Sequence, residues 1–280
     1  MKVAIIGMGY LGSQIREVIS AFCVDPIITH HQHQVGGDSQ LFDILQDDIR
    51  SVSRGEAVDL VFITAKVEFT EETHALFMGM RNLVRACRKS RIVYFSSDGI
   101  YDGLKGNYKE IETPNAKTLY GGNLALCEQI VREEAHNYVI IRPSYIYGYA
   151  DEEKTRLDSR LSRVKQTVSV KHRVEWFSDM YRSPMHVRQV AKVSVQLANS
   201  EYQGIAHVAG PRMSVYEFVR DAVEAMGYDP SLVVGVSKSD DPKKHPPDTS
   251  LDTSLMTRLT GIVPFGVKES IQFFSDDIAH

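Results

Sequence analysis

The chain opens with the stretch MKVAIIGMGYLG, residues 1–12, and this stretch decides the fold. Val3–Ile6 is a short apolar run typical of a buried strand, and apolar residues then recur at helical spacing over 11–22. The connection between them is a GxGxxG pattern, Gly7-Met8-Gly9-Tyr10-Leu11-Gly12. Glycines at these places allow a tight turn and let the backbone approach a pyrophosphate at the N-terminus of the helix. We therefore expect these six residues to bind a dinucleotide; a packing turn without a ligand is the alternative.

The same alternation continues along the first half of the chain. Short β-branched runs lie at residues 26–29, 59–63, 91–95 and 138–141, and a helix-length segment separates each run from the next. Strands that alternate with helices predict an α/β fold, a Rossmann-type doubly wound parallel sheet with helices on both faces. Such sheets bind ligands outside the carboxyl ends of their strands, so the residues just after each run are the candidates for a site.

The regular alternation stops after Gly148, where a charged segment over 151–173 predicts a helix. We infer two domains from this change. The expected NAD(P)-binding Rossmann domain covers residues 1–148 plus about 183–208, and the expected smaller, C-terminal substrate-binding lobe covers about 149–182 plus 209–280.

Composition restricts the class of protein. The 280 residues are 43% hydrophobic and 24% charged, and 32 basic against 36 acidic residues give a net charge of −4, which argues against nucleic acid or an anionic membrane as a partner. No apolar run reaches the roughly 18 residues that span a bilayer. The three cysteines, Cys23, Cys87 and Cys127, are scattered and lack CxxC spacing, as in reduced packing residues. We expect a soluble, cytoplasmic protein.

The end of the second strand indicates which cofactor is bound. An acid there accepts from the ribose 2′-hydroxyl of NAD, but the sequence reads His30-His31-Gln32-His33. The missing acid favours NADP over NAD, with His30 or His31 near the 2′-phosphate. A metal site made of the three histidines is the alternative, but no carboxylate or cysteine stands at suitable spacing, so we expect no metal. Asp38 lies beside the adenine or in a solvated loop.

Several further segments, all in the same order, resemble a known family, the extended short-chain dehydrogenases/reductases, and most closely its dTDP-4-dehydrorhamnose reductase branch. The matching segments are Tyr94-Phe95-Ser96-Ser97-Asp98-Gly99-Ile100-Tyr101-Asp102-Gly103, Tyr120-Gly121 with Glu128, Arg142-Pro143-Ser144-Tyr145-Ile146-Tyr147-Gly148, Arg182-Ser183-Pro184-Met185-His186-Val187 and Ser250-Leu251-Asp252-Thr253-Ser254. The likeness extends over nearly the whole chain.

The resemblance implies an active site. In the family a tyrosine protonates the developing alkoxide of a ketone during hydride transfer, and a serine or threonine hydrogen-bonds the carbonyl. These roles fall on Tyr120 and Ser97. The other cofactor-binding residues implied are Thr64, Ala65, Lys66, Ser96, Tyr120, Arg142 and Pro143. The other substrate-binding residues implied are Asp98, Tyr101, Arg182 and His245. For Arg142 and Arg182 a structural salt bridge is the alternative.

One departure from the family pattern bears on catalysis. The family carries a lysine four residues after its tyrosine, and this lysine lowers the tyrosine pKa and holds the nicotinamide ribose; here that position is Leu124. Two other lysines can supply the missing positive charge. Lys66 follows the third strand, and Lys117 can share a helix face with Tyr120 if the helix has already begun there. The alternative is that both are ordinary surface lysines. We take Lys66 as the third catalytic candidate. His245-Pro246 also replaces the Arg-Pro pair of the branch.

These features support three functions. The first is an NAD(P)-dependent reductase or related oxidoreductase that acts on a nucleotide-linked keto sugar. The second is a catalytically degenerate member that binds a dinucleotide or sugar nucleotide and acts as a sensor or as a regulatory subunit of another enzyme. The third is an NAD-dependent epimerase or dehydratase. A homodimer is the expected arrangement if the chain associates with itself.

Overall fold

A computed structural model describes residues 1–22, 24–32, 38–53, 55–149, 157–238 and 246–276. The chain divides into two compact units. The first unit comprises Met1–Tyr101, Thr113–Arg142 and Ala191–Ala206, and the second comprises Asp102–Glu112, Pro143–Val190 and His207–His280. In the described part of the chain, none of the helices has the length and apolar character needed to cross a membrane.

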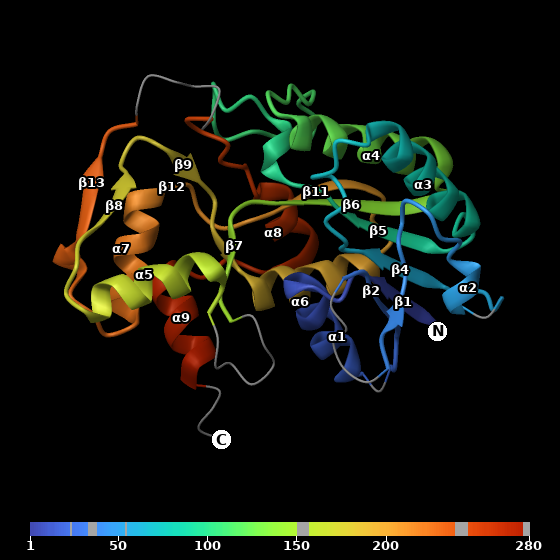
Figure 1. Cartoon of the computed structure of the whole chain (residues 1–280), viewed down its shortest axis with the longest axis horizontal. Helices are drawn as coiled ribbons and strands as arrows, with labels where there is room; N and C mark the ends of the chain where they lie inside the picture. The colour runs from blue at the N-terminus through green and yellow to red at the C-terminus, as the bar shows by residue number, and fades with distance from the viewer. Residues whose placement is uncertain (23, 33–37, 54, 150–156, 239–245, 277–280) are drawn as a thin grey trace. The chain divides into compact units, whose positions relative to one another are not determined.

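The first unit is built on one sheet with the strand order β11-β6-β5-β4-β1-β2-β3 (Figure 1). Strands β1 to β6 of this sheet pair in parallel. The strands are β1 (Val3–Ile6), β2 (Ile27–His30), β3 (Gln40–Leu41), β4 (Leu60–Ile63), β5 (Arg91–Phe95), β6 (Asn137–Pro143) and β11 (Gly204–Val208). The helices are α1 (Tyr10–Ser20), α2 (Arg50–Ser53), α3 (Thr73–Ala86), the 3-10 helix η1 (Asp98–Ile100), α4 (Leu119–Glu134) and, from Ala191 onward, α6 (Val187–Ala198).

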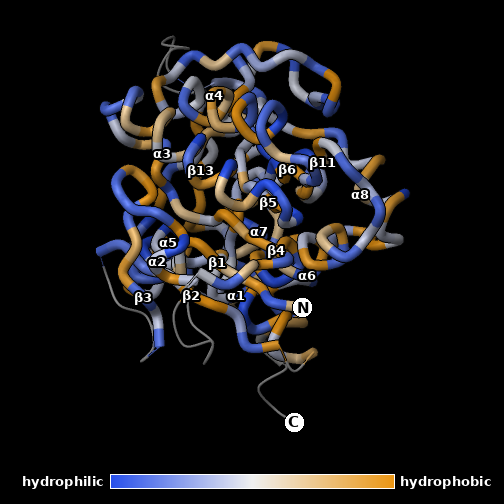
Figure 2. The backbone as a smooth tube through the Cα atoms, turned by 90° about the vertical axis from the view of Figure 1, so that its right-hand side faces the viewer, coloured by the Kyte–Doolittle hydropathy of each residue, from blue (hydrophilic) through white to orange (hydrophobic). Residues whose placement is uncertain are grey.

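Helices cover both faces of this sheet. Figure 1 shows α3 and α4 on one face and α1 and α6 on the other. Every residue of β1 and of β4 is buried. Figure 2 colours the backbone along these two strands as hydrophobic. Burial on both sides explains why the strands are continuous apolar runs instead of alternating ones. The predicted doubly wound parallel sheet is confirmed.

The strand order reverses at β1, because β2 pairs with one of its edges and β4 with the other. A doubly wound sheet binds its ligands outside the carboxyl ends of the strands at this reversal. The glycine-rich loop follows β1, and residues 64–70 follow β4. The fold therefore brings these two loops to the place where a ligand is expected.

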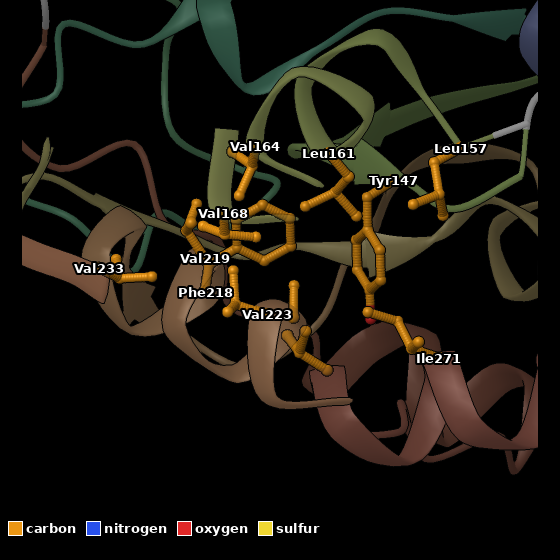
Figure 3. Close-up of a cluster of buried hydrophobic side chains, with 12 residues drawn as sticks. Tyr147, Leu157, Leu161, Val164, Val168, Phe218, Val219, Val223, Val233 and Ile271 are labelled. Carbon is orange, nitrogen blue, oxygen red and sulfur yellow. The ribbon is translucent and has the colours of Figure 1, made fainter. Parts of the chain in front are cut away.

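The second unit has its own hydrophobic core. Figure 3 shows Tyr147 and Phe218 at its centre, with their ring centroids 5.1 Å apart. Its strands are β7 (Ile146–Tyr147), β8 (Val174–Phe177), β9 (Tyr181–Arg182), β10 (Met185–His186), β12 (Met213–Ser214) and β13 (Val233–Val236). Its helices are α5 (Ser159–Ser169), α7 (Val215–Ala225), the 3-10 helix η2 (Pro230–Leu232), α8 (Ser254–Thr260) and α9 (Val267–Asp276).

The helix expected over 151–173 is shorter than the charge pattern suggested. Helix α5 begins at Ser159 because Asp158 caps it: the carboxylate accepts from the backbone N–H of Arg160 at 3.0 Å and of Leu161 at 3.3 Å. The helix ends at Ser169, and residues 150–156 lie outside the described residues.

Four segments that were expected in the cofactor domain lie in the second unit: residues 102–112, 143–148, 183–190 and 207–208. Hydrogen bonds hold the first of them: the N–H of Tyr108 donates to the carbonyl of Ser250 at 2.9 Å, and the N–H of Asp248 donates to the carbonyl of Gly103 at 2.9 Å. Strand pairing joins residues 143–148 to residues 183–190, because β7 pairs with β10.

A buried ion pair joins helix α4 to strand β6 in the first unit. The Arg142 guanidinium donates through Nε at 2.8 Å and through one Nη at 2.6 Å to the two carboxylate oxygens of Glu128. Its other Nη donates to the Tyr101 hydroxyl at 2.7 Å. The side chains of Arg142 and Glu128 are each 1% exposed, so each charge depends on the other for its compensation.

The substitution Glu128→Gln leaves this arginine buried and uncompensated. We expect it to lower the free energy of unfolding by about 3 to 5 kcal/mol in urea denaturation. The matched control is Glu133→Gln on the exposed side of the same helix, which should change the free energy by no more than about 0.5 kcal/mol. Equal effects of the two substitutions would show that the buried pair does not stabilise the fold.

Candidate active site

The glycine loop packs closely against Thr64 and Ala65, which directly follow β4. Gly7 has φ +102°, and a Cβ built on it lies 2.6 Å from the backbone N of Ala65. A Cβ on Gly12 lies 2.3 Å from the carbonyl oxygen of Gly7. The Thr64 hydroxyl donates to that same oxygen at 2.6 Å. A Cβ on Gly9, by contrast, meets no atom within 4 Å. The first and third glycines serve packing, and the second faces open space.

The N-terminus of α1 is suited to an anion. Gly9 is the N-cap residue; no side chain caps this helix, and its first turn carries no acidic residue. The first backbone N–H groups of a helix lack intrahelical partners, and together with the helix dipole they favour a negative charge. Open space over Gly9 and this N-terminus fit the pyrophosphate of a dinucleotide. Met8 and Leu11 belong to the same turn; the Met8 N–H donates to the carbonyl of Thr29 at 2.7 Å.

The end of β2 presents a mixed set of charges. His30 ends the strand, and its Nδ1 atom is buried without a hydrogen-bond partner among the described residues. His31 Nε2 lies 3.6 Å from the Asp43 carboxylate. Asp38 is largely exposed and lies 3.7 Å from the Arg16 guanidinium, a cation that the sequence analysis missed. His33 is outside the described residues, and no cluster of three or more metal-binding side chains occurs within them.

Tyr120 and Ser97 lie together. Tyr120 is in the first turn of α4, and Ser97 caps η1, which follows β5. Both residues lie beside Gly99: a Cβ built on that glycine is 3.1 Å from Cε1 of Tyr120 and 3.7 Å from Oγ of Ser97. The Ser97 hydroxyl donates to the Asp98 carboxylate at 2.9 Å and accepts from the N–H of Gly99 at 3.2 Å. The structure therefore brings together the predicted proton donor, the predicted carbonyl ligand and Asp98.

Among the described residues, no lysine or arginine side chain makes a hydrogen bond to the Tyr120 hydroxyl. Leu124, one turn further along α4, is 1% exposed. The helix begins at Leu119, so Lys117 precedes it, and its Nζ donates to Asn115 Oδ1 at 3.2 Å. Lys66 is exposed; burial raises the pKa of Glu68, and the positive charge of Lys66 opposes only part of that rise.

Sequence reasoning missed three residues next to Tyr120. The Phe69 ring stacks on the Tyr120 ring with centroids 4.2 Å apart and planes at 14°. Asn123 fixes this loop, because its Nδ2 donates to the carbonyls of Glu68 and Thr70, each at 2.9 Å. Glu68 is buried, and its carboxylate accepts from the Tyr94 hydroxyl at 2.7 Å. Only the spacing of Asn123, three residues after Tyr120, gave a sequence signal.

This environment disfavours the charged form of Tyr120. Burial is the main cause that raises the tyrosine pKa above its ordinary value of 10, and the Glu68 carboxylate is the second. The nearby Ser97 hydroxyl lowers the pKa, and the charge of Asp98 raises it. Tyr120 therefore holds its proton at neutral pH.

The remaining predicted residues have varied surroundings. Ser96 is buried, and its hydroxyl has no hydrogen-bond partner among the described residues. Arg142 and Tyr101 are engaged in the buried ion-pair group, and Pro143 ends β6. Arg182, in the second unit, donates to the backbone carbonyls of Tyr181 at 2.6 Å and Pro246 at 3.0 Å. His245 lies outside the described residues.

Curated relatives match part of the chain. The spore coat polysaccharide biosynthesis protein SpsK of Bacillus subtilis is 29% identical over 147 residues, which are 51% of this chain and 49% of that protein. The bovine (Bos taurus) methionine adenosyltransferase 2 subunit beta is 28% identical over 201 residues, 66% of this chain and 58% of that protein. The chain thus spans about half the length of these relatives.

A solved structure matches the whole fold. The dTDP-4-dehydrorhamnose reductase of Bacillus anthracis, in complex with NADP, superposes with a TM-score of 0.80 over 99% of both chains at 20% identity. This likeness confirms the Rossmann-type fold. The model of the RmlD substrate binding domain matches residues 9–279, nearly the entire sequence. The chain therefore belongs to the RmlD substrate binding domain family.

Proposed function

We propose that this protein is an NAD(P)-dependent reductase that acts on a nucleotide-linked keto sugar. The pair of Tyr120 and Ser97, whose side chains meet beside Gly99, carries the proposal. It lies in the same unit as the glycine loop, and the strands β1, β4 and β5 that lead to these groups are neighbours in the sheet. Membership of the family supports the same class of substrate.

The proposed cofactor is NADP, or else NAD. The loop from Gly7 to Gly12 would hold the pyrophosphate against α1. His30, His31 and Arg16 would surround a 2′-phosphate, with Asp38 beside the adenosine. The NADP bound to the Bacillus anthracis reductase supports this choice. Contacts to the rest of the cofactor are proposed for Thr64, Ala65, Lys66, Ser96, Tyr120, Arg142 and Pro143.

The bound dinucleotide supplies a hydride. In our proposal the Ser97 hydroxyl donates a hydrogen bond to the ketone oxygen, and Tyr120 gives its proton to that oxygen as negative charge develops there. A tyrosine with a raised pKa is present in its acid form at neutral pH, although it is a weaker acid. Lys66 is the proposed cation of the site. Asp98, Tyr101, Arg182 and His245 are the proposed contacts of the sugar nucleotide.

An epimerase or dehydratase would use the same tyrosine. Those reactions begin with the oxidation of a hydroxyl group, for which the tyrosine must accept a proton.

Leu124 favours a second candidate function. A member that has lost the lysine binds its ligands without turnover and regulates another enzyme. The match to the methionine adenosyltransferase 2 subunit beta is consistent with this candidate. In that case the protein partner is an enzyme; a homodimer is compatible with either function.

Turnover separates the two candidates. With NADPH and a panel of nucleotide 4-keto sugars, we expect the wild type to oxidise NADPH and Tyr120→Phe to lower kcat by about 100-fold or more, because the proton donor is lost. The matched control, Tyr138→Phe at the amino end of β6, should keep the wild-type rate. A wild type that binds both ligands but shows no turnover would favour the regulatory candidate. Equal rates for wild type and Tyr120→Phe would contradict the assigned proton donor.

Gly9 tests the cofactor site apart from the fold. A Cβ at Gly9 meets no protein atom, so Gly9→Ala should lower the free energy of unfolding by no more than about 1 kcal/mol. The added methyl group would occupy the space of the pyrophosphate, and we expect NADPH affinity in calorimetric titration to fall by about tenfold or more. The control is Gly266→Ala in the second unit, which also meets no atom within 4 Å. An unchanged affinity in Gly9→Ala would identify the loop as a packing turn.

A further inference from the structure

Phe69 is an exposed aromatic residue in contact with the proposed proton donor. The residue is 63% exposed, although its ring stacks on the Tyr120 ring with the two centroids 4.2 Å apart and the planes at 14°. An apolar side chain that stays largely in water gains little from the hydrophobic effect, so burial does not fix its place. Other contacts have to hold the ring where it is.

The loop that carries Phe69 is held by buried hydrogen bonds on both sides of this residue. Asn123, on α4, is 1% exposed. Its Nδ2 donates to the carbonyl of Glu68 at 2.9 Å and to the carbonyl of Thr70 at 2.9 Å. The Thr73 hydroxyl donates to Asn123 Oδ1 at 3.1 Å and so fixes the orientation of the amide. One side chain therefore holds the residue before Phe69 and the residue after it.

Glu68 provides a second anchor for this loop, on the sheet. Its carboxylate accepts from the hydroxyl of Tyr94 on β5 at 2.7 Å, and both residues are buried. The polar groups around Phe69 are thus buried and paired, whereas the aromatic ring lies at the surface, the reverse of the usual arrangement. What these hydrogen bonds fix is the place of the Phe69 ring.

Tyr120 depends on few other contacts for its orientation. Within the described ranges no lysine or arginine hydrogen-bonds its hydroxyl, and Leu124 stands at the lysine position of the family pattern. Phe69 covers one face of the tyrosine ring, and Gly99 adjoins one edge, where a built Cβ lies 3.1 Å from Cε1. Aromatic pairs have preferred geometries, so the stacked ring restricts how the phenol turns.

We propose that Asn123 is a positioning residue, which acts through Phe69 to hold the Tyr120 phenol in the orientation for proton transfer. The proposal rests on the proposed role of Tyr120 as proton donor. Both N–H groups of the Asn123 amide are used by the loop, so its effect on the reaction is indirect. Misplacement of a reacting group by about 1 Å can lower a rate about 100-fold, so such a residue acts mainly on kcat.

Kinetics with NADPH and a nucleotide 4-keto sugar test this effect. Asn123→Ala removes both hydrogen bonds to the loop, and we expect kcat to fall by about tenfold because the phenol is no longer held. Phe69→Leu keeps these bonds and removes the stacked ring, and it should lower kcat by the same factor. In both variants the affinity for NADPH in calorimetric titration should stay within about twofold of the wild type, because a positioning role moves kcat and not cofactor binding.

The double variant shows whether Asn123 acts through Phe69. If it does, Asn123→Ala adds nothing once the ring is gone, and the double variant keeps the kcat of Phe69→Leu within about twofold. Two losses that multiply to about 100-fold would overturn the proposal. The matched controls are Asn199→Ala, which removes an amide that donates to the carbonyl of Val195 at 2.9 Å, and Phe22→Leu, at a residue that is 70% exposed. Both should keep the wild-type kcat.

The ring contact can be measured without turnover. In protein with ¹³C-labelled tyrosine rings, Tyr120→Phe identifies the Tyr120 signal by its loss from the nuclear magnetic resonance spectrum. The ring current of Phe69 displaces this signal in the wild type, and we expect the displacement to disappear in Phe69→Leu and in Asn123→Ala. If Asn123→Ala does not fold by circular dichroism, Asn123→Ser replaces it in every measurement, because a hydroxyl has a single donor and cannot bond both carbonyls.

The two measurements separate this proposal from the proposed function. A displacement that disappears in Asn123→Ala, with no turnover in any protein, would overturn the reductase function and leave the link from Asn123 through Phe69 to Tyr120 supported. Turnover together with an unchanged displacement in Asn123→Ala would overturn the positioning role and leave the reductase function standing. A wild-type kcat in Asn123→Ala would also overturn the positioning role.

Discussion

Strands β1 and β4 lie side by side in register, from Val3 beside Leu60 to Ile6 beside Ile63, and the loops that follow them therefore leave the sheet at the same place. The absence of a side chain at Gly7 allows the backbone of Ala65 to come within contact, and the Thr64 hydroxyl ties the two loops together. This close approach sets where the 64–70 loop runs. The positions of Glu68 and Phe69, and hence the surroundings of Tyr120, depend on it.

Two buried carboxylates on or beside α4 have opposite electrostatic surroundings. Glu128 is neutralised by the guanidinium of Arg142 through two hydrogen bonds, and the pair joins a helix to a strand. Glu68 has a phenol as its partner, which satisfies one oxygen but supplies no positive charge. The charge of Glu128 is compensated by Arg142, and its main effect is to hold α4 against β6. Burial raises the pKa of the second carboxylate, which disfavours its charged form.

The sequence predicted the features that depend on local pattern. Patterns of consecutive residues indicate the buried strands, the glycine loop and the segments with Ser97 and Tyr120. The order of strands in the sheet follows from general rules of winding. Glu68 was missed because it stands in Val67-Glu68-Phe69-Thr70-Glu71-Glu72, where an acid looks like one of several solvated charges. Its burial results from Asn123, which is 55 residues away in the chain. Arg142 and Arg182 were ambiguous for the same reason: two of the groups to which they donate, the Tyr101 hydroxyl and the Pro246 carbonyl, lie 41 and 64 residues away in the sequence.

The stacked ring of Phe69 has a consequence for the stereochemistry of the proposed reaction. Because Asn123 fastens the loop on both sides of Phe69, the loop does not swing away without breaking two hydrogen bonds. One face of the Tyr120 phenol is thus permanently occupied by carbon. A ketone that receives the tyrosine proton has to approach from the open face or along the edge of the ring. In the proposed reaction, this one-sided access restricts the orientations in which a sugar can present its carbonyl to the tyrosine.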